Sequence, residues 1–191
     1  MSAASQMLEI PEVRARVSAV TVEQYHQFPE FNANGRRTEL LRGVVIEKVS
    51  KSPLHCRTAK ALYDHLLRAI PRGFCVRKDD PLTLCDSEPE PDLAVVRGDD
   101  RDFSNRHPST AALVIEVAVT SATADRSMAS LYAEAGVEEY WIVLPVERRV
   151  EVYRHAEVGT YLGRIVVEGD ATLECLSIPG VSLRLVDFFD A

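Results

Sequence analysis

The sequence predicts a single α/β domain, and three observations lead to this prediction. The chain has 191 residues, 46% of them hydrophobic, which is enough to bury one substantial core. Its expected elements follow the order helix, strand, strand, strand, helix, strand, with further β-structure at both ends. Residues 113–119, LVIEVAV, are apolar on both strand faces and indicate a buried strand. The sequence contains no internal repeat, linker or low-complexity tract.

The N-terminal part is expected to hold an arm and a short helix. Residues 1–20 show little periodicity and predict a loose arm, so that the domain itself spans residues 21–191. Thr21 and Gln24 have the spacing of a capping box, which predicts a short helix that ends before Pro29.

A hairpin and the first core helix are expected next. The sequence RTELLRGVVIEKV at 37–49 predicts a hairpin that turns at Arg42-Gly43. Ser52-Pro53 has the order of an N-cap followed by a proline at the first helical position, and residues 71–73 would end that helix. Its apolar face would contain Ala59, Leu62, Leu66 and Ile70.

The rest of the chain is expected to alternate strands with one more helix. Thr123 would cap a helix over residues 125–135, and Gly136 would end it. Residues from 148 onward alternate polar and apolar, which predicts an antiparallel β extension. The remaining strands are expected at 74–84, 91–96, 113–119 and 139–145, and the extension at 148–155, 159–169 and 171–178.

Composition excludes some classes of function. No run of 18 or more apolar residues exists, so no membrane-spanning segment is expected, and the N-terminus lacks the apolar stretch of a secretory signal. The four cysteines have no CxxC spacing, so we expect buried thiols in the reducing cytoplasm and neither a zinc site nor a disulfide framework. They are Cys56, Cys75, Cys85 and Cys175.

Charge is distributed unevenly along the chain. The net charge of -7 argues against coating nucleic acid by bulk attraction. However, the segment from Arg36 to Lys78 holds eleven Lys or Arg against three Asp or Glu. This segment could contact phosphates, although ordinary solvated helix and hairpin faces would give some of the same asymmetry.

Two acids are the principal candidates for chemistry. Glu116 lies within an apolar strand, where a carboxylate loses hydration unless a cation or hydrogen-bond donors compensate. Its alternative is a strand-end glutamate that faces solvent or pairs with an arginine. Asp92 follows Pro91 at a strand entrance, two residues beyond Glu90 and four beyond Glu88. For Glu88 and Glu90 a solvated acidic loop is the simpler interpretation.

Acids on adjacent strand ends, with Glu39 as a third, are suitable ligands for Mg²⁺ or Mn²⁺. Such an ion lowers the pKa of a bound water and stabilises charge on a phosphate. These residues alone predict a metal-carboxylate site, and a sugar-phosphate enzyme would have the same pattern.

The order and spacing of five segments resemble the Uma family of putative restriction endonucleases, within the PD-(D/E)XK nuclease superfamily. The resemblance runs from about Thr21 to Tyr153, and more loosely to the C-terminus. It implies a restriction-endonuclease-like core, a mixed sheet flanked by helices. The segments are TVEQYHQFPE, RTELLRGVVIEKVSKSPLHCRTAKAL, DPLTLCDSEPEPDLAVVRG, LVIEVAVTSATADR and LYAEAGVEEYWIVLP.

The resemblance implies a role for each matching residue. Asp92 would be the aspartate of the PD element and Glu116 the acid of the next strand, with the carbonyl of Val117 completing the metal shell. Glu39 would be a further acidic site residue. His55 matches a histidine often present near the start of the helix, whereas the sequence alone suggests a surface or capping histidine.

The chain departs from the superfamily at its lysine. Ala118 stands where the motif lysine is expected, and Met128 stands where many relatives carry a lysine on the next helix; its spacing there predicts core packing. Arg126, Lys78 or another cation would have to substitute.

Three hypotheses follow. The first is a Mg²⁺- or Mn²⁺-dependent endonuclease that hydrolyses phosphodiester bonds, preferably of DNA, by a metal-activated water, and a homodimer would suit cutting two strands. The second is a catalytically impaired nuclease-like protein that binds nucleic acid or a partner. The third is an α/β domain whose acids pair with Arg97, Arg106 or Arg126.

Overall fold

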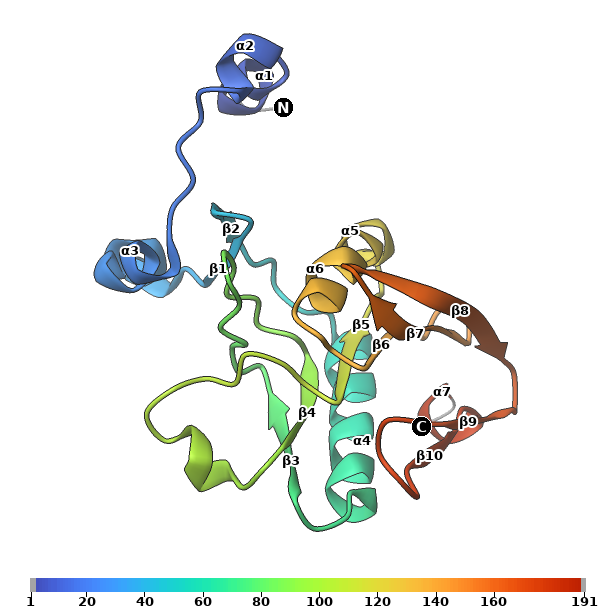
Figure 1. Cartoon of the computed structure of the whole chain (residues 1–191). Helices are drawn as coiled ribbons and strands as arrows, with labels where there is room; N and C mark the ends of the chain where they lie inside the picture. The colour runs from blue at the N-terminus through green and yellow to red at the C-terminus, as the bar shows by residue number, and fades with distance from the viewer. Residues whose placement is uncertain (1–2, 190–191) are drawn as a thin grey trace. The chain divides into compact units, whose positions relative to one another are not determined.

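The computed structural model describes residues 3–189, which form two compact units. One unit comprises the chain up to Lys48 together with Asp86–Glu88, and the other comprises Val49–Cys85 and the chain from Pro89 onward. Figure 1 shows the elements of both units along the chain. The arm expected over residues 1–20 contains two short helices.

The smaller unit is built from short helices and one hairpin. The elements are α1 (Ala3–Leu8), α2 (Pro11–Arg14), α3 (Val22–Gln27), the 3-10 segment η1 (Pro29–Gly35), β1 (Thr38–Leu41) and β2 (Val44–Glu47). The capping box of Thr21 and Gln24 is present with both of its hydrogen bonds. The hairpin turns where predicted, because Arg42 and Gly43 both adopt positive φ, as a two-residue turn requires.

Glu88 does not belong to a solvated loop, contrary to the sequence-based interpretation. Its backbone pairs with Leu40 of β1, and its side chain is only 6% exposed. His26 Nε2 lies 2.7 Å from Glu88 Oε1, so this carboxylate has a polar partner inside the smaller unit.

The larger unit contains a mixed six-stranded sheet with helices on both faces, as the sequence predicts. The elements are α4 (Pro53–Ala69), β3 (Phe74–Lys78), β4 (Leu93–Arg97), η2 (Asp100–Phe103), β5 (Leu113–Val117), α5 (Ala122–Ser127), α6 (Ala129–Glu134), β6 (Glu139–Leu144), β7 (Arg149–Glu157), β8 (Thr160–Glu168), β9 (Thr172–Glu174), β10 (Ser182–Arg184) and α7 (Val186–Phe189). The strands of the sheet run in the order β3-β4-β5-β6-β7-β8. Only β5 and β6 are parallel, because α5 and α6 connect them in a crossover.

The two faces of the central strand β5 serve different purposes. Leu113, Ile115 and Val117 join the main apolar cluster with Leu62 and Leu66 of α4. Because strand side chains alternate, Glu116 points to the opposite face, on which α6 lies. In Figure 1, α4 runs along one face of the strands β3 to β5.

Four expectations about the larger unit were wrong in detail. The strand expected at 74–84 ends at Lys78, because Asp79 has φ +56° and Pro81 cannot donate to a ladder. The helix expected at 125–135 begins at Ala122, with Thr123 inside it, and it breaks at Met128. Met128 is therefore only partly buried at the junction, not a core residue.

The third expected strand of the C-terminal extension forms a separate ladder. β7 and β8 extend the main sheet, but β9 pairs with β10 in a two-stranded sheet.

The fourth error concerns the cysteines, which were expected to be buried. Cys175 is buried, whereas Cys56 and Cys85 are exposed. Within residues 3–189, no helix is long and apolar enough to cross a membrane.

Candidate active site

Asp92 and Glu116 lie side by side where β4 begins and β5 ends. β4 runs antiparallel to β5 with Leu93 opposite Ile115, so the residue before β4 faces Glu116. The Asp92 N–H donates to Glu116 Oε2 at 3.1 Å, and the Val117 N–H donates to Asp92 Oδ2 at 2.8 Å. The sheet register itself thus holds the two carboxylates together.

Glu116 is held from the helical side of the sheet. The hydroxyl of Tyr132 on α6 donates to Glu116 Oε1 at 3.1 Å. Tyr132 is fully buried, so its hydroxyl is fixed by the packing of α6. One oxygen of Glu116 therefore accepts from the helix and the other from the Asp92 backbone.

The N-terminus of α4 brings two basic side chains to Asp92. Ser52 caps the helix by accepting from the His55 N–H at 3.2 Å, which fixes the first turn. His55 Nε2 donates to Asp92 Oδ2 at 2.8 Å. Lys51, one residue before the cap, donates from Nζ to Asp92 Oδ1 at 2.6 Å and also bonds Asp79 Oδ1.

These contacts determine the charge state of the site. Burial alone would raise the pKa of the Asp92 carboxyl, but the His55 hydrogen bond and the Lys51 charge lower that pKa to about 2. Burial would lower the pKa of Lys51, yet Asp92 and Asp79 outweigh it and raise the pKa. Asp92 is therefore an anion and Lys51 a cation at neutral pH.

The oxygen donors of Asp92 and Glu116 fit a hard divalent cation that keeps most of its water. Mg²⁺ is commonly held by one or two carboxylates together with substrate phosphates. Among residues 3–189, no group of three or more His, Cys, Asp or Glu could by itself hold a metal ion, so a dedicated side-chain cage is absent from that part of the chain. A cation would share Asp92 with Lys51 and His55 or replace them.

Two residues that the sequence placed in the site have other partners in the structure. Arg126 pairs with the buried Glu151 of β7, with Nη2 and Oε1 2.6 Å apart, so its guanidinium is used in packing α5 against the sheet. Glu39 belongs to the smaller unit, where its carboxylate lies 3.6 Å from Lys48 Nζ.

The cation beside Asp92 is Lys51, which the sequence-based reasoning did not identify. Lys78, an expected substitute for the motif lysine, pairs with Asp79. Ala118 is buried, and Met128 lies at the break between α5 and α6. Two signals could have identified Lys51: it directly precedes the N-cap of α4, and it is four residues before His55.

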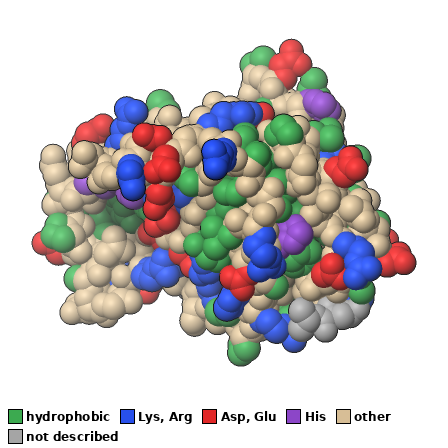
Figure 2. All heavy atoms as spheres, turned by 90° about the horizontal axis from the view of Figure 1, so that it is seen from below, with side chains coloured by type: hydrophobic (Ala, Val, Ile, Leu, Met, Phe, Trp, Pro, Cys, Tyr) green, Lys and Arg blue, Asp and Glu red, His purple; other side chains and the backbone are tan. Residues whose placement is uncertain are grey.

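The basic segment Arg36–Lys78 is not a uniform positive surface. Many of its cations pair with nearby acids, for example Arg36 with Glu47 and Lys60 with Asp64. On the face drawn in Figure 2, basic and acidic side chains are interspersed. Net charge along the chain therefore overstates the positive potential that this segment offers to phosphates.

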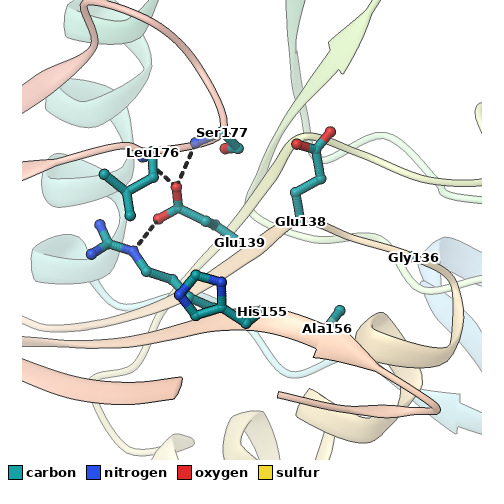
Figure 3. A pocket seen from close by; sticks show the side chains of 8 residues that line it. Gly136, Glu138, Glu139, His155, Ala156, Leu176 and Ser177 are labelled. Carbon is teal, nitrogen blue, oxygen red and sulfur yellow. Dashed lines mark hydrogen bonds and ion pairs between the residues drawn. The ribbon is translucent and has the colours of Figure 1, made fainter. Parts of the chain in front are cut away.

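A cavity of about 320 Å³ lies at the start of β6, and its polar groups have a structural role. Figure 3 shows the Glu139 carboxylate turned toward the loop at Leu176 and Ser177. It accepts from both of those backbone N–H groups, from Arg154 Nε at 2.8 Å and from Trp141 Nε1 at 2.9 Å. A carboxylate so fully used anchors the loop. The cavity is lined by Gly136, Glu138, Glu139, Arg154, His155, Ala156, Leu176 and Ser177.

The fold and its paired strand-end acids define a restriction-endonuclease-like protein. The family described as "Putative restriction endonuclease" (Uma2) matches residues 22–186, and the chain belongs to this family. The fold is similar to the crystal structure of a putative nuclease of DUF820 from Anabaena variabilis, with a TM-score of 0.76 and 18% identity. That match covers 90% of this chain and 98% of the other. No curated protein matches the chain.

Proposed function

We propose that the protein is a divalent-cation-dependent endonuclease that hydrolyses phosphodiester bonds of DNA. One observation carries the proposal: the adjacent carboxylates of Asp92 and Glu116 lie beside two basic groups, Lys51 and His55. Phosphodiester cleavage needs this combination, because carboxylates hold the cation and basic groups oppose charge on the phosphate. Membership of the family favours nucleic acid over a sugar phosphate as substrate.

The cation, when bound, would lower the pKa of a water molecule and stabilise negative charge on the phosphate. The chain's own residues have simpler tasks. Asp92 and Glu116 would hold Mg²⁺ or Mn²⁺, and the carbonyl of Val117 would add a third oxygen. In the reaction, water adds to phosphorus and the ester bond to the leaving oxygen breaks. The proton that the water loses balances the one that the leaving oxygen gains.

Digestion of supercoiled plasmid tests the proposal. We expect wild-type protein to nick or linearise DNA in Mg²⁺ or Mn²⁺, and Asp92→Ala to lose at least 100-fold in rate. Asp64→Asn is a matched control. Asp64 is a carboxylate on α4, and within residues 3–189 its ion pair is with the exposed Lys60. Wild-type protein that fails to cut any DNA or RNA in either cation would contradict the proposal.

A nuclease-like protein that binds nucleic acid without cutting is the second candidate. Both Asp92 oxygens are already engaged, by Lys51, His55 and the Val117 N–H, and this observation favours it. The two candidates differ in one result: DNA binding in Ca²⁺ without cleavage in Mg²⁺ or Mn²⁺ would support the second.

Assembly and location complete the proposal. β8 is an edge strand of the main sheet with exposed Leu162, Ile165 and Val166, which favours pairing with a second copy. A homodimer would place two sites for cutting two strands. Sedimentation velocity would show whether the protein is a dimer in solution.

We also propose a cytoplasmic location, where the four thiols stay reduced.

A further inference from the structure

We propose that Lys51 supplies the cationic contact to the phosphate under attack, and that Asp79 is its positioning residue. The inference rests on the proposed function and extends it to residues that the sequence had not identified.

Lys51 is held on two sides. Its Nζ bonds Asp92 Oδ1 at 2.6 Å and also Asp79 Oδ1, and its side chain is only 25% exposed. A lysine side chain loses rotamer entropy when it is held in one position, and two partners offset that loss better than one. The ammonium therefore has a defined position beside Asp92.

Asp79 is placed for this task by the backbone. It follows β3 with φ +56°, and its N–H donates to the carbonyl of Asp92 at 3.3 Å. Lys78 bonds the second Asp79 oxygen, so Asp79 is oriented by a cation other than Lys51. Asp79 can keep Lys51 in place when Asp92 turns an oxygen to a divalent cation.

The chemistry assigns Lys51 to the phosphate. Hydrolysis concentrates negative charge on the phosphate oxygens, and a fixed cation that is partly shielded from water stabilises that charge more than a mobile one in solvent. Lys51 is the lysine whose Nζ bonds Asp92, and Asp92 is the proposed cation ligand. A phosphate bound to the same cation would lie within reach of that ammonium.

The test compares Lys51→Met with Lys60→Met, an exposed lysine on the same helix that pairs with Asp64. Single-turnover cleavage with Lys51→Met should fall about 100-fold, while DNA affinity in Ca²⁺ should change less than threefold. Lys51→Arg should recover part of the rate, because arginine keeps the charge. Lys60→Met should cut within twofold of wild type.

Asp79→Asn is the second variant, because it removes the charge of the carboxylate that holds Lys51 and keeps the size of the side chain. It should slow cleavage about tenfold in the wild-type background and change the rate little in Lys51→Met, since it acts through Lys51. Thermal melting establishes that each variant is folded, and calorimetry with Mn²⁺ alone measures cation affinity independently of cutting.

Several results would overturn the inference. If wild type cuts and folded Lys51→Met cuts as fast, Lys51 does not serve the phosphate, although the proposed function stands. If Lys51→Met binds Mn²⁺ at least tenfold more tightly and cuts faster, Lys51 is a competitor of the cation. If wild type does not cut at all, the proposed function and this inference fail together.

Discussion

Asp92 illustrates how neighbouring groups decide the state of one buried carboxylate. A buried carboxylate without partners is destabilised by several kcal/mol, and its pKa rises. Asp92 accepts instead from Lys51, His55 and the Val117 N–H, and its pKa lies at about 2. The anion is thus stable before any metal ion arrives, and a cation must compete with these groups for its oxygens.

Met128→Lys tests at the residue scale whether the site already has its cation. If Lys51 fills that role, a new lysine at the junction of α5 and α6 should raise the plasmid-cutting rate no more than twofold. The junction is partly exposed, so the longer side chain is tolerated without loss of folding. A tenfold gain in cutting would mean that the natural site lacks an effective cation.

Sequence could single out some of these residues but not their partners. Glu116 stands out as an acid in an apolar strand, and Asp92 follows a proline at a strand entrance. The position of Lys51 beside the α4 cap is only a weak signal, and Asp79 has no local pattern that distinguishes it. Lys51 meets Asp92 through the packing of α4 on the sheet, and Asp79 meets it through the pairing of β3 with β4. Arg126 has the expected charge, but β7 supplies Glu151 as its partner.

At the scale of elements, the start of α4 aligns the basic groups of the site. Ser52 accepts from the His55 N–H, and Lys51 directly precedes this cap. Ser52→Ala should lower the free energy of unfolding by about 1 kcal/mol and slow cleavage several-fold, because the first turn frays. Urea titration and single-turnover cleavage measure the two effects.

Thr21→Ala is the matched control, since Thr21 caps α3 in the smaller unit. It should lose similar stability from that helix and leave the cleavage rate within twofold of wild type. If both variants lost the same fraction of the cleavage rate, the α4 cap would not be responsible for aligning the basic groups of the site.

Glu151 provides a pH test of how β7 is attached to its neighbours. Hydrogen bonds from Arg126 outweigh burial and, with Arg164, lower the pKa of Glu151 to about 2, against an ordinary value of 4.5. Because the folded state binds the proton less tightly, this contribution is complete above about pH 5 and is lost as pH falls toward 2.

Urea unfolding of wild type and Glu151→Gln between pH 3 and 7 measures this contribution. Wild type should exceed the variant by about 1–3 kcal/mol at pH 7, and the difference should shrink at pH 3. A difference that does not change with pH would show that the ion pairs of Glu151 do not stabilise the fold.

Element boundaries were less predictable than element types. The helix from 53 and the strand 113–117 follow from caps and apolar runs. The break at Met128 does not, because nothing in the local sequence competes with a continuous helix there. β9 pairs with β10 and not with β8, a choice made by long-range contacts that alternation alone cannot reveal.

At the scale of the molecule, the order of elements in the sequence predicted an α/β core, and the family resemblance implied a mixed sheet flanked by helices; both are confirmed. The parallel pair β5–β6 follows from the helical crossover between them, and the other neighbours are antiparallel. The division into two compact units was not predicted, because Asp86–Glu88 joins the N-terminal hairpin across a long stretch of sequence. Glu39 accordingly lies in a different unit from Asp92.

Calorimetric titration with Mn²⁺ tests whether Asp92 and Glu116 form a binding site for a divalent cation. Wild-type protein should bind Mn²⁺, and Asp92→Asn and Glu116→Gln should each weaken binding at least tenfold while melting cooperatively. Glu138→Gln, which removes an exposed carboxylate paired with Arg97, should bind as wild type does. Absence of binding to wild type, or equal affinity in all four proteins, would show that Asp92 and Glu116 do not form a cation site.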